Sequence, residues 1–231
     1  MKICGLNKTT LLDYPGKVAA TIFLGGCNFR CPFCHNGGLV LDPGAEPEMG
    51  REEILAFLKK RQGILEGVCV TGGEPTLASE LPGFLEEIKA LGYQVKLDTN
   101  GSRPEMVRVL LEEKLADCVA MDIKSSPENY GKVTGIRQMH MDEIMESVEL
   151  IRKKAPAYEF RTTVVRELHD AEDFRKIGKW LAGADAYYLQ AYQDSDQVIR
   201  SGFSSYTRKE LEKFCDILRV TIPGVQIRGV D

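Results

Sequence analysis

The densest group of reactive side chains in this 231-residue sequence is a set of three thiols, Cys27, Cys31 and Cys34, within eight residues. Three thiolates on one short loop can converge on a metal centre, because a regular helix or strand would carry them apart. A structural zinc is closed by four protein ligands, whereas an iron–sulfur cube held by three cysteines keeps one iron open. His35 follows Cys34 directly and adjacent side chains tend to point apart, so a zinc knuckle closed by His35 is the strained alternative.

The spacing Cys-x3-Cys-x2-Cys, with Phe33 just before the last cysteine, resembles the cluster loop of the radical S-adenosylmethionine (radical SAM) enzymes. The extension Cys-His-Asn at residues 34–36 is similar to that of the activating enzymes of glycyl-radical enzymes. The runs LLDYPG at 11–16 and IFLGGCNFRCP at 22–32 most resemble the activating proteins of anaerobic ribonucleotide reductases. The resemblance covers about residues 8–193.

Around this loop the chain alternates β-rich runs with amphipathic stretches. Period-two and period-3.6 patterns predict strands at 18–24, 67–71, 94–98, 117–123, 158–165, 186–190 and 225–228. They predict helices at 51–62, 81–91, 104–115, 142–154, 171–181 and 207–219, the last opened by a capping box. Crossover helices return the chain to the same end of a sheet, so we expect a wholly parallel sheet.

The fold class expected from this alternation is α/β, as a curved, open, parallel (β/α)6 partial barrel of the radical SAM type. Six strand–helix units are too few for a closed eight-stranded barrel. A flat doubly wound sheet is the alternative, but the first strand–helix turn carries no Gly-rich dinucleotide fingerprint.

Polar motifs follow four predicted strands. The cysteine loop follows the first, TGGEP at 71–75 the second, DTNG at 98–101 the third and DIK at 122–124 the fourth. Ligands bind at the carboxyl ends of parallel strands, so these motifs predict one site at that edge.

The second motif looks like the Gly-Gly-Glu motif that holds the amino group of S-adenosylmethionine in the radical family. Gly72 and Gly73 would let the backbone approach a ligand closely, and Glu74 would accept hydrogen bonds from the ammonium. The resemblance also places Phe33 and Asn36 of the cysteine loop beside the cofactor. A plain turn would use two glycines equally well.

The third and fourth motifs supply Asp98, Thr99, Asn100, Asp122 and Lys124. The resemblance implies that they surround the ribose and the methionyl carboxylate of the cofactor. Two carboxylates at one mouth repel unless a cation, a lysine or water relieves them, so a bridging monovalent cation is an expectation. The simpler alternative is an Asx-type turn and a surface ion pair.

Farther along, Arg166 ends a predicted strand and is expected to face the adenosyl group, although one exposed arginine on a core strand is an equal alternative. Gln193 stands where related activases often have a histidine. That substitution puts a role for such a histidine in hydrogen transfer in doubt here.

The resemblance implies one 4Fe-4S cluster on the three cysteines, which reduces S-adenosylmethionine with an electron from flavodoxin or ferredoxin. The resulting 5'-deoxyadenosyl radical would take hydrogen from a glycine of a partner, either anaerobic ribonucleotide reductase or another glycyl-radical enzyme such as pyruvate formate-lyase. A radical enzyme acting on a small molecule, like 7-carboxy-7-deazaguanine synthase, is the rival. No acid, base or nucleophile is required from the side chains.

Composition sets the outer limits. With 43% hydrophobic residues the chain can form one domain over 1–231, with its core at about 16–193 and a terminal helix and strand at about 207–228. A net charge of -4 gives no footprint for nucleic acid or an anionic membrane. No apolar run approaches about 20 residues and no signal peptide is present, so a cytoplasmic protein is expected.

The other four of the seven cysteines are scattered singly, which suits reduced thiols rather than disulfides. They are Cys4, Cys69, Cys118 and Cys215. No second Cys-x-x-Cys group is present, so a single cluster is expected.

Overall fold

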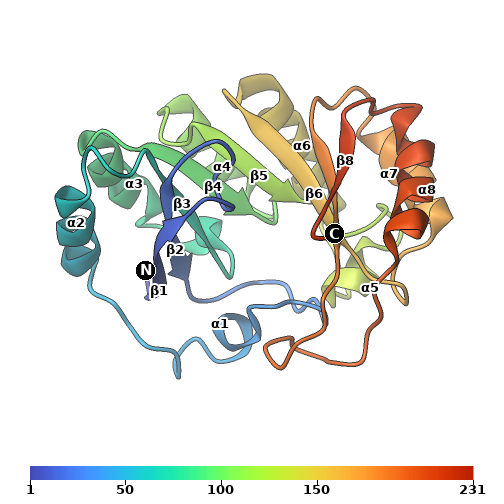
Figure 1. Ribbon diagram of the computed structural model, residues 1–231, viewed down its shortest axis with the longest axis horizontal. Coiled ribbons are helices and arrows are strands. Elements are labelled where there is room, and N and C mark those ends of the chain that lie inside the picture. The colour runs from blue at the N-terminus through green and yellow to red at the C-terminus, as the bar shows by residue number, and fades with distance from the viewer. Residues whose placement is uncertain (231) are drawn as a thin grey trace.

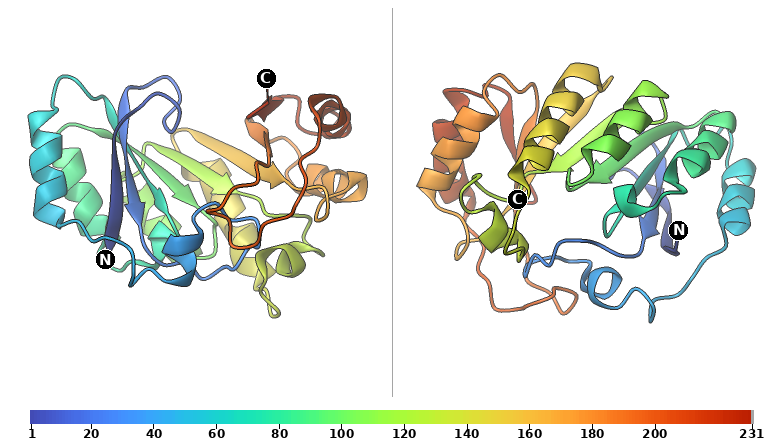
Figure 2. Two further views of the ribbon diagram at one scale, coloured as in Figure 1. Left: turned by 60° about the horizontal axis from the view of Figure 1, so that its bottom comes forward. Right: turned by 180° about the vertical axis from the view of Figure 1, so that it is seen from behind.

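A computed structural model describes residues 1–230 of the chain. Its eight strands form one curved sheet in which spatial order follows sequence order from β1 to β8 (Figure 1). Long helices cover its outer face, as the view from behind shows (Figure 2). The strands are β1 (Ile3–Thr10), β2 (Ala19–Leu24), β3 (Gly67–Gly72), β4 (Gln94–Thr99), β5 (Cys118–Asp122), β6 (Tyr158–Val164), β7 (Tyr187–Ala191) and β8 (Val225–Arg228).

Every pair from β2 to β8 is parallel, which confirms the predicted α/β class with its mostly parallel sheet. The expectation of a wholly parallel sheet was wrong, because β1 pairs antiparallel with β2. The connection over residues 11–18 contains no helix, and so short a link cannot make the crossover that parallel pairing needs.

The long helices lie where the apolar periodicity predicts them, with ends that differ by one to three residues. Their apolar stripes are buried against the sheet, for example Phe84, Leu85 and Ile88 on α3. The predicted capping box at Thr207 and Glu210 is present. The long helices are α2 (Arg51–Lys60), α3 (Leu81–Ala90), α4 (Pro104–Glu112), α6 (Met141–Lys154), α7 (Ala171–Trp180) and α8 (Arg208–Arg219).

Three short elements escaped prediction. They are α1 (Gly37–Leu41), α5 (Tyr130–Thr134) and the 3-10 turn η1 (Pro75–Leu77). A helix of one turn has little stability of its own and forms where tertiary contacts hold it. All three lie at the carboxyl-end edge of the sheet or in the loops beside it (Figure 1).

The two faces of the sheet differ in chemistry. The outward face is apolar, and its side chains pack under the helices, as Val95 and Leu97 of β4 do. The concave face carries charge, with Lys96 and Asp98 on the same strand buried among other charged groups. This alternation follows the period of two in a strand. No helix among residues 1–230 has the length and apolar character needed to cross a bilayer.

Candidate active site

The cysteine loop connects β2 to α1 and is held in place by distant parts of the chain. The amide of Glu74 donates to the Gly26 carbonyl at 2.7 Å, and the amide of Arg30 donates to the Thr134 carbonyl at 2.9 Å. The amide of Ile199 donates to the Cys34 carbonyl at 3.2 Å. Three backbone segments far apart in sequence therefore fix the loop.

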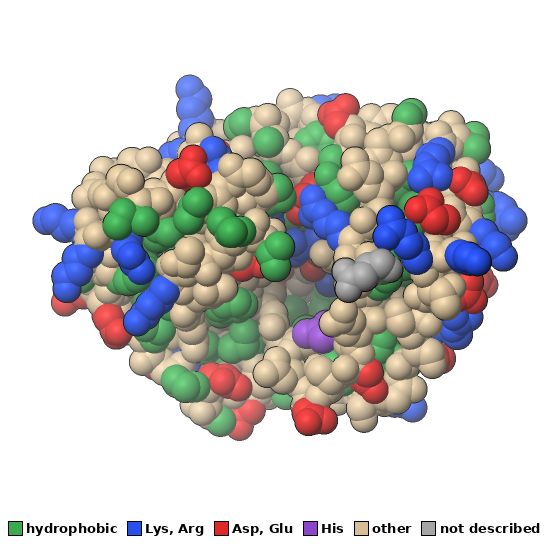
Figure 3. Space-filling view, in the orientation of Figure 1, with side chains coloured by type: hydrophobic (Ala, Val, Ile, Leu, Met, Phe, Trp, Pro, Cys, Tyr) green, Lys and Arg blue, Asp and Glu red, His purple; other side chains and the backbone are tan. Residues whose placement is uncertain are grey.

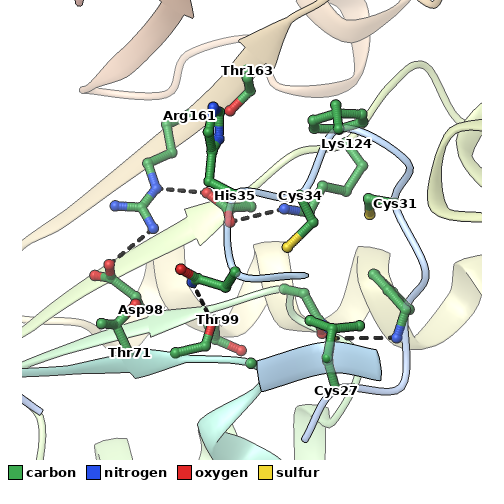
Figure 4. A pocket seen from close by; sticks show the side chains of 18 residues that line it. Cys27, Cys31, Cys34, His35, Thr71, Asp98, Thr99, Lys124, Arg161 and Thr163 are labelled. Carbon is green, nitrogen blue, oxygen red and sulfur yellow. Dashed lines mark hydrogen bonds and ion pairs between the residues drawn. The ribbon is translucent and has the colours of Figure 1, made fainter. Parts of the chain in front are cut away.

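The three thiols line one cavity together with the ends of β3 to β6 (Figure 4). Burial raises the pKa of the Cys27 thiol to about 11 and that of Cys31 to about 12. The Cys27 sulfur accepts from the Phe29 amide at 3.3 Å and from Asn100 Nδ2 at 3.8 Å. These donors favour the thiolate, which is the form that binds metal.

The zinc alternative would need His35 as its fourth ligand. Across residues 1–230, no group of three or more His, Cys, Asp or Glu side chains converges closely enough to hold a single ion. His35 is engaged elsewhere, with Nε2 2.6 Å from the Gln193 carbonyl and its ring 5.6 Å from that of Tyr192. The geometry therefore lacks the closed four-ligand set of a structural zinc.

The opposite wall of the cavity carries most of the side chains predicted from the motifs. The cavity between the two walls has a volume of about 170 Å³. The hollow is visible on the face shown in Figure 3. The predicted residues that line it are Phe33, Asn36, Gly72, Gly73, Asp98, Thr99, Asn100, Asp122 and Lys124.

The two glycines serve the packing of the cysteine loop. Gly72 has a φ of 120°, and a Cβ there would collide with the backbone of Leu24. A Cβ on Gly73 would collide with the Gly26 carbonyl. Asn36 Nδ2 also donates to the Gly72 carbonyl at 2.7 Å. The absence of a Cβ at these two positions thus lets the end of β3 pack directly against the loop that carries the thiols.

The Glu74 side chain, which was expected to accept hydrogen bonds from the ammonium of the cofactor, is engaged by neighbouring donors of the chain. Its carboxylate is 2% exposed and accepts from the Asn100 amide at 2.6 Å, from Thr99 Oγ1 at 2.8 Å and from two donors of Thr76. Burial raises the pKa of this carboxyl, against the effect of those donors. Glu74 is absent from the cavity wall. Its side chain ties the β3 turn to the end of β4.

Charged groups meet at the inner end of the cavity. Arg161 Nε donates to Asp122 at 2.5 Å and its Nη2 donates to Asp98 at 2.9 Å (Figure 4). Lys124 Nζ lies 2.9 Å from Asp122. Burial raises the pKa of the Asp122 carboxyl, but Arg161 and Lys124 outweigh it and hold that pKa well below its usual range. Arg161 thus bridges the two aspartates.

Arg166, which was expected to face the adenosyl group, pairs with a carboxylate at the rim of the barrel. Its guanidinium donates to both carboxylate oxygens of Glu210, at 2.9 and 2.6 Å, and lies 4.3 Å from the centre of the Tyr206 ring. It is absent from the cavity wall. Arg166 follows the end of β6 and fastens α8 to the rim.

The side of the barrel is spanned by the segment over residues 193–206, here called the strap. Its backbone bonds the cysteine loop at three points: Gln197 O to the Gly37 amide, the Ile199 amide to Cys34 O, and the Arg200 amide to Pro32 O. The two segments run together along the open edge (Figure 1). Gln193 begins the strap, and the wall of the thiol cavity does not include it.

Apart from His35, five residues of the cavity wall were not among the predicted site residues: Phe29, Val40, Thr71, Arg161 and Thr163. The signal for the last two was the alternation along β6, where Glu159, Arg161 and Thr163 take one face and apolar or small side chains the other. A charged alternate face on a central parallel strand is unusual, because such strands are normally apolar on both faces.

This combination of fold and site matches a known class. The family model of the radical SAM superfamily matches residues 21–181, a range that includes the three thiols and all strand-end motifs of the cavity. The chain therefore belongs to the radical SAM superfamily.

Its relatives narrow the membership to the glycyl-radical enzyme activating enzymes. The chain is 33% identical over 201 residues to a Methanocaldococcus jannaschii protein named as a glycyl-radical enzyme activating enzyme, covering 84% of this chain and 81% of that one. It is 30% identical over 183 residues to the pyruvate formate-lyase-activating enzyme of Clostridium pasteurianum, covering 76% and 74%.

Solved structures agree on the fold. Streptococcus suis SuiB superposes with a TM-score of 0.70 at 13% identity, over 90% of this chain and 48% of that one. The structure titled native anSMEcpe with bound AdoMet gives 0.59 at 19% identity, over 84% and 57%. The chain thus spans about half the length of these proteins, and the likeness establishes the radical SAM partial barrel.

Proposed function

We propose that this protein is an activase that generates a glycyl radical on a partner enzyme, and that the partner is anaerobic ribonucleotide reductase. The observation that carries the proposal is the single cavity in which three thiols face the polar ends of four neighbouring parallel strands. The names of the two relatives support an activase. The run at residues 11–16 supports the choice of partner, with pyruvate formate-lyase as the alternative.

The donor set fits the cofactors that the superfamily implies. Cys27, Cys31 and Cys34 would hold a 4Fe-4S cluster, since three thiols on one wall leave one iron for a ligand from the cavity. Bound there, the cluster and S-adenosylmethionine supply a one-electron cleavage of a carbon–sulfur bond that yields methionine and a 5'-deoxyadenosyl radical.

The chain's own residues bind, orient and exclude water. Thr99 and Asn100 offer polar contacts beside the thiols, and Lys124 offers a cation for a carboxylate. The loop residues Asn28 and Arg30, which flank the buried Phe29 between the first two thiols, are exposed. That surface would receive the electron donor, for which flavodoxin or ferredoxin is proposed.

The test is to mix reduced, reconstituted protein with S-adenosylmethionine and the reductase under anaerobic conditions. A glycyl doublet in the electron paramagnetic resonance spectrum, which collapses when the partner contains deuterated glycine, supports the proposal. Formation of 5'-deoxyadenosine with no partner radical would indicate a small-molecule substrate instead. A second relative favours that alternative. The chain is 32% identical to a probable GTP 3',8-cyclase of Thermococcus kodakarensis over 149 residues, which is 63% of this chain and 47% of that one.

A further inference from the structure

Both oxygens of each aspartate in the cavity already have a cationic partner from the chain itself. The Asp98 oxygens bind Lys96 Nζ at 2.5 Å and Arg161 Nη2 at 2.9 Å. The Asp122 oxygens bind Arg161 Nε at 2.5 Å and Lys124 Nζ at 2.9 Å. Each of the four carboxylate oxygens therefore already accepts a hydrogen bond from a positively charged donor.

The strand register explains how one side chain reaches both carboxylates. Arg161 on β6 lies directly opposite Asp122 on β5. Asp98 on β4 lies opposite Ala120 on β5, two strands away from Arg161. Because adjacent strands are about 4.8 Å apart, the guanidinium must cross β5 to reach Asp98, and the short side chain of Ala120 leaves that path open.

The chemistry of the guanidinium suits this bridge better than a hydrated metal ion does. Arginine is permanently charged, and its planar fork presents several donors in fixed directions. A monovalent metal ion would need the same carboxylate oxygens, as hard cations take oxygen ligands. The Asp98 and Arg161 side chains are 12% and 16% exposed, so water does little to screen either charge. The expected cation would therefore have to compete with Arg161 for the same two carboxylates.

We propose that Arg161 is a built-in cation that holds Asp98 and Asp122 in place for S-adenosylmethionine, so that this site works without a bound monovalent metal ion. Arg161 is thus a positioning residue. The inference rests on the proposed S-adenosylmethionine site and deepens it, because it names the group that keeps the two strand-end motifs together.

The first test uses the unaltered, reconstituted protein and leaves out the partner. The dissociation constant of S-adenosylmethionine is measured in potassium chloride and in choline chloride at equal ionic strength. The expected values are equal. Binding that is tighter in potassium by about tenfold or more, a difference of about 1.4 kcal/mol, would overturn the proposal.

The second test removes the guanidinium. Arg161→Ala in choline chloride should bind S-adenosylmethionine roughly 10- to 100-fold more weakly at unchanged iron content, because two buried carboxylates lose a partner. Millimolar guanidinium or potassium should restore much of the loss in this variant alone. Arg161→Ala with wild-type affinity in choline chloride would overturn the proposal. Arg166→Ala is the matched control, since that guanidinium pairs with Glu210 at the rim.

A third measurement keeps the result separate from the proposed function. The thermal midpoint of the cluster-free protein requires neither cofactor nor partner. Potassium should raise the midpoint of Arg161→Ala and leave the wild type unchanged relative to choline. If potassium raises both midpoints equally, Arg161 does not fill the cation position. Arg161→Lys, which keeps a charge but cannot fork, should fall between the two and serves where the alanine variant does not fold.

Discussion

Arg161 and Arg166 lie five residues apart, yet one belongs to the interior of the barrel and the other to its rim. The Arg161 side chain is 16% exposed and bridges two carboxylates that come from other strands. The Arg166 side chain is 40% exposed and pairs with one carboxylate of α8. The sequence analysis named Arg166, at the end of the strand, whereas the arginine on the cavity wall is Arg161, on the inner face of the same strand.

The difference shows where charge has consequences in this fold. An exposed ion pair is screened by water and contributes little to stability. A buried pair is expensive to break, about 3–5 kcal/mol in typical proteins, because one charge is left without a partner in a poorly solvated place. Substitutions on the inner face should therefore affect the site strongly, and substitutions on the rim should affect it weakly.

The largest effect is expected from a thiol on the inner wall. Cys31→Ala should fail to retain about four irons after reconstitution and should not cleave S-adenosylmethionine, because each thiolate holds a separate iron. Iron analysis and 5'-deoxyadenosine formation measure this. Cys215→Ala, a buried thiol on the outer side in α8, should keep its iron and lose only about 1–2 kcal/mol of stability. Full iron content in Cys31→Ala would contradict the ligand assignment.

The next effect is expected at Glu74, where burial predicts a structural role. Glu74→Ala leaves the donors of Thr76, Thr99 and Asn100 without an acceptor. The unfolding free energy of the cluster-free protein should fall by about 3–5 kcal/mol in urea. Glu86→Ala on the exposed face of α3 is the control. A variant with wild-type stability but weakened S-adenosylmethionine binding would return Glu74 to the role of cofactor ligand.

A smaller, pH-dependent effect is expected from His169. Its Nδ1 accepts from the Val165 amide at 3.1 Å and its Nε2 lies 2.8 Å from the Lys124 carbonyl, as in the neutral ring. Burial lowers the pKa of His169 below its usual 6.5. The unfolded chain then takes up the proton first as pH falls, so stability is present above pH 6.5 and declines below it, by at most about 1.4 kcal/mol per pH unit.

Urea unfolding of the cluster-free protein between about pH 5 and 7 measures this slope, and comparison with His169→Gln separates it from carboxyl groups with a raised pKa such as Glu74. His169→Gln should flatten it. If the unfolding free energies of the variant and the wild type change with pH by the same amount, other groups set the pH dependence.

The smallest effect is expected at the rim. Arg166→Ala should leave the affinity for S-adenosylmethionine and the iron content unchanged, with a slight decrease in the thermal midpoint, because the pair with Glu210 is exposed to water. Isothermal titration of the reconstituted protein measures the affinity. A loss of affinity of about tenfold would mean that the rim reaches the cofactor and would remove the contrast between the two arginines.

The features that could be predicted from the sequence are those that depend on residues close together in the chain. The parallel strands and long helices were predicted within a few residues, because their apolar periodicity is local. The thiols and strand-end motifs of the cavity could be read because their chemistry is concentrated in short runs. β1 was missed, since its place depends on pairing with β2 rather than on its own pattern.

The site was harder to predict where contacts are set by tertiary structure. The direction of the Glu74 side chain depends on donors from β4 and the turn after it, such as the Asn100 amide. The bridge made by Arg161 depends on the register of three strands and on a small residue, Ala120, between them. None of these contacts can be inferred from residues that are adjacent in the sequence.

The way the cysteine loop is tied down has a consequence for how the enzyme matures. Its backbone partners come from η1, α5 and the strap, so the shape of the loop exists only after almost the whole chain has folded. These bonds involve backbone groups and need no iron. Folding should therefore precede metallation. A cluster-assembly system would transfer the iron–sulfur cluster to the folded protein rather than to a nascent chain.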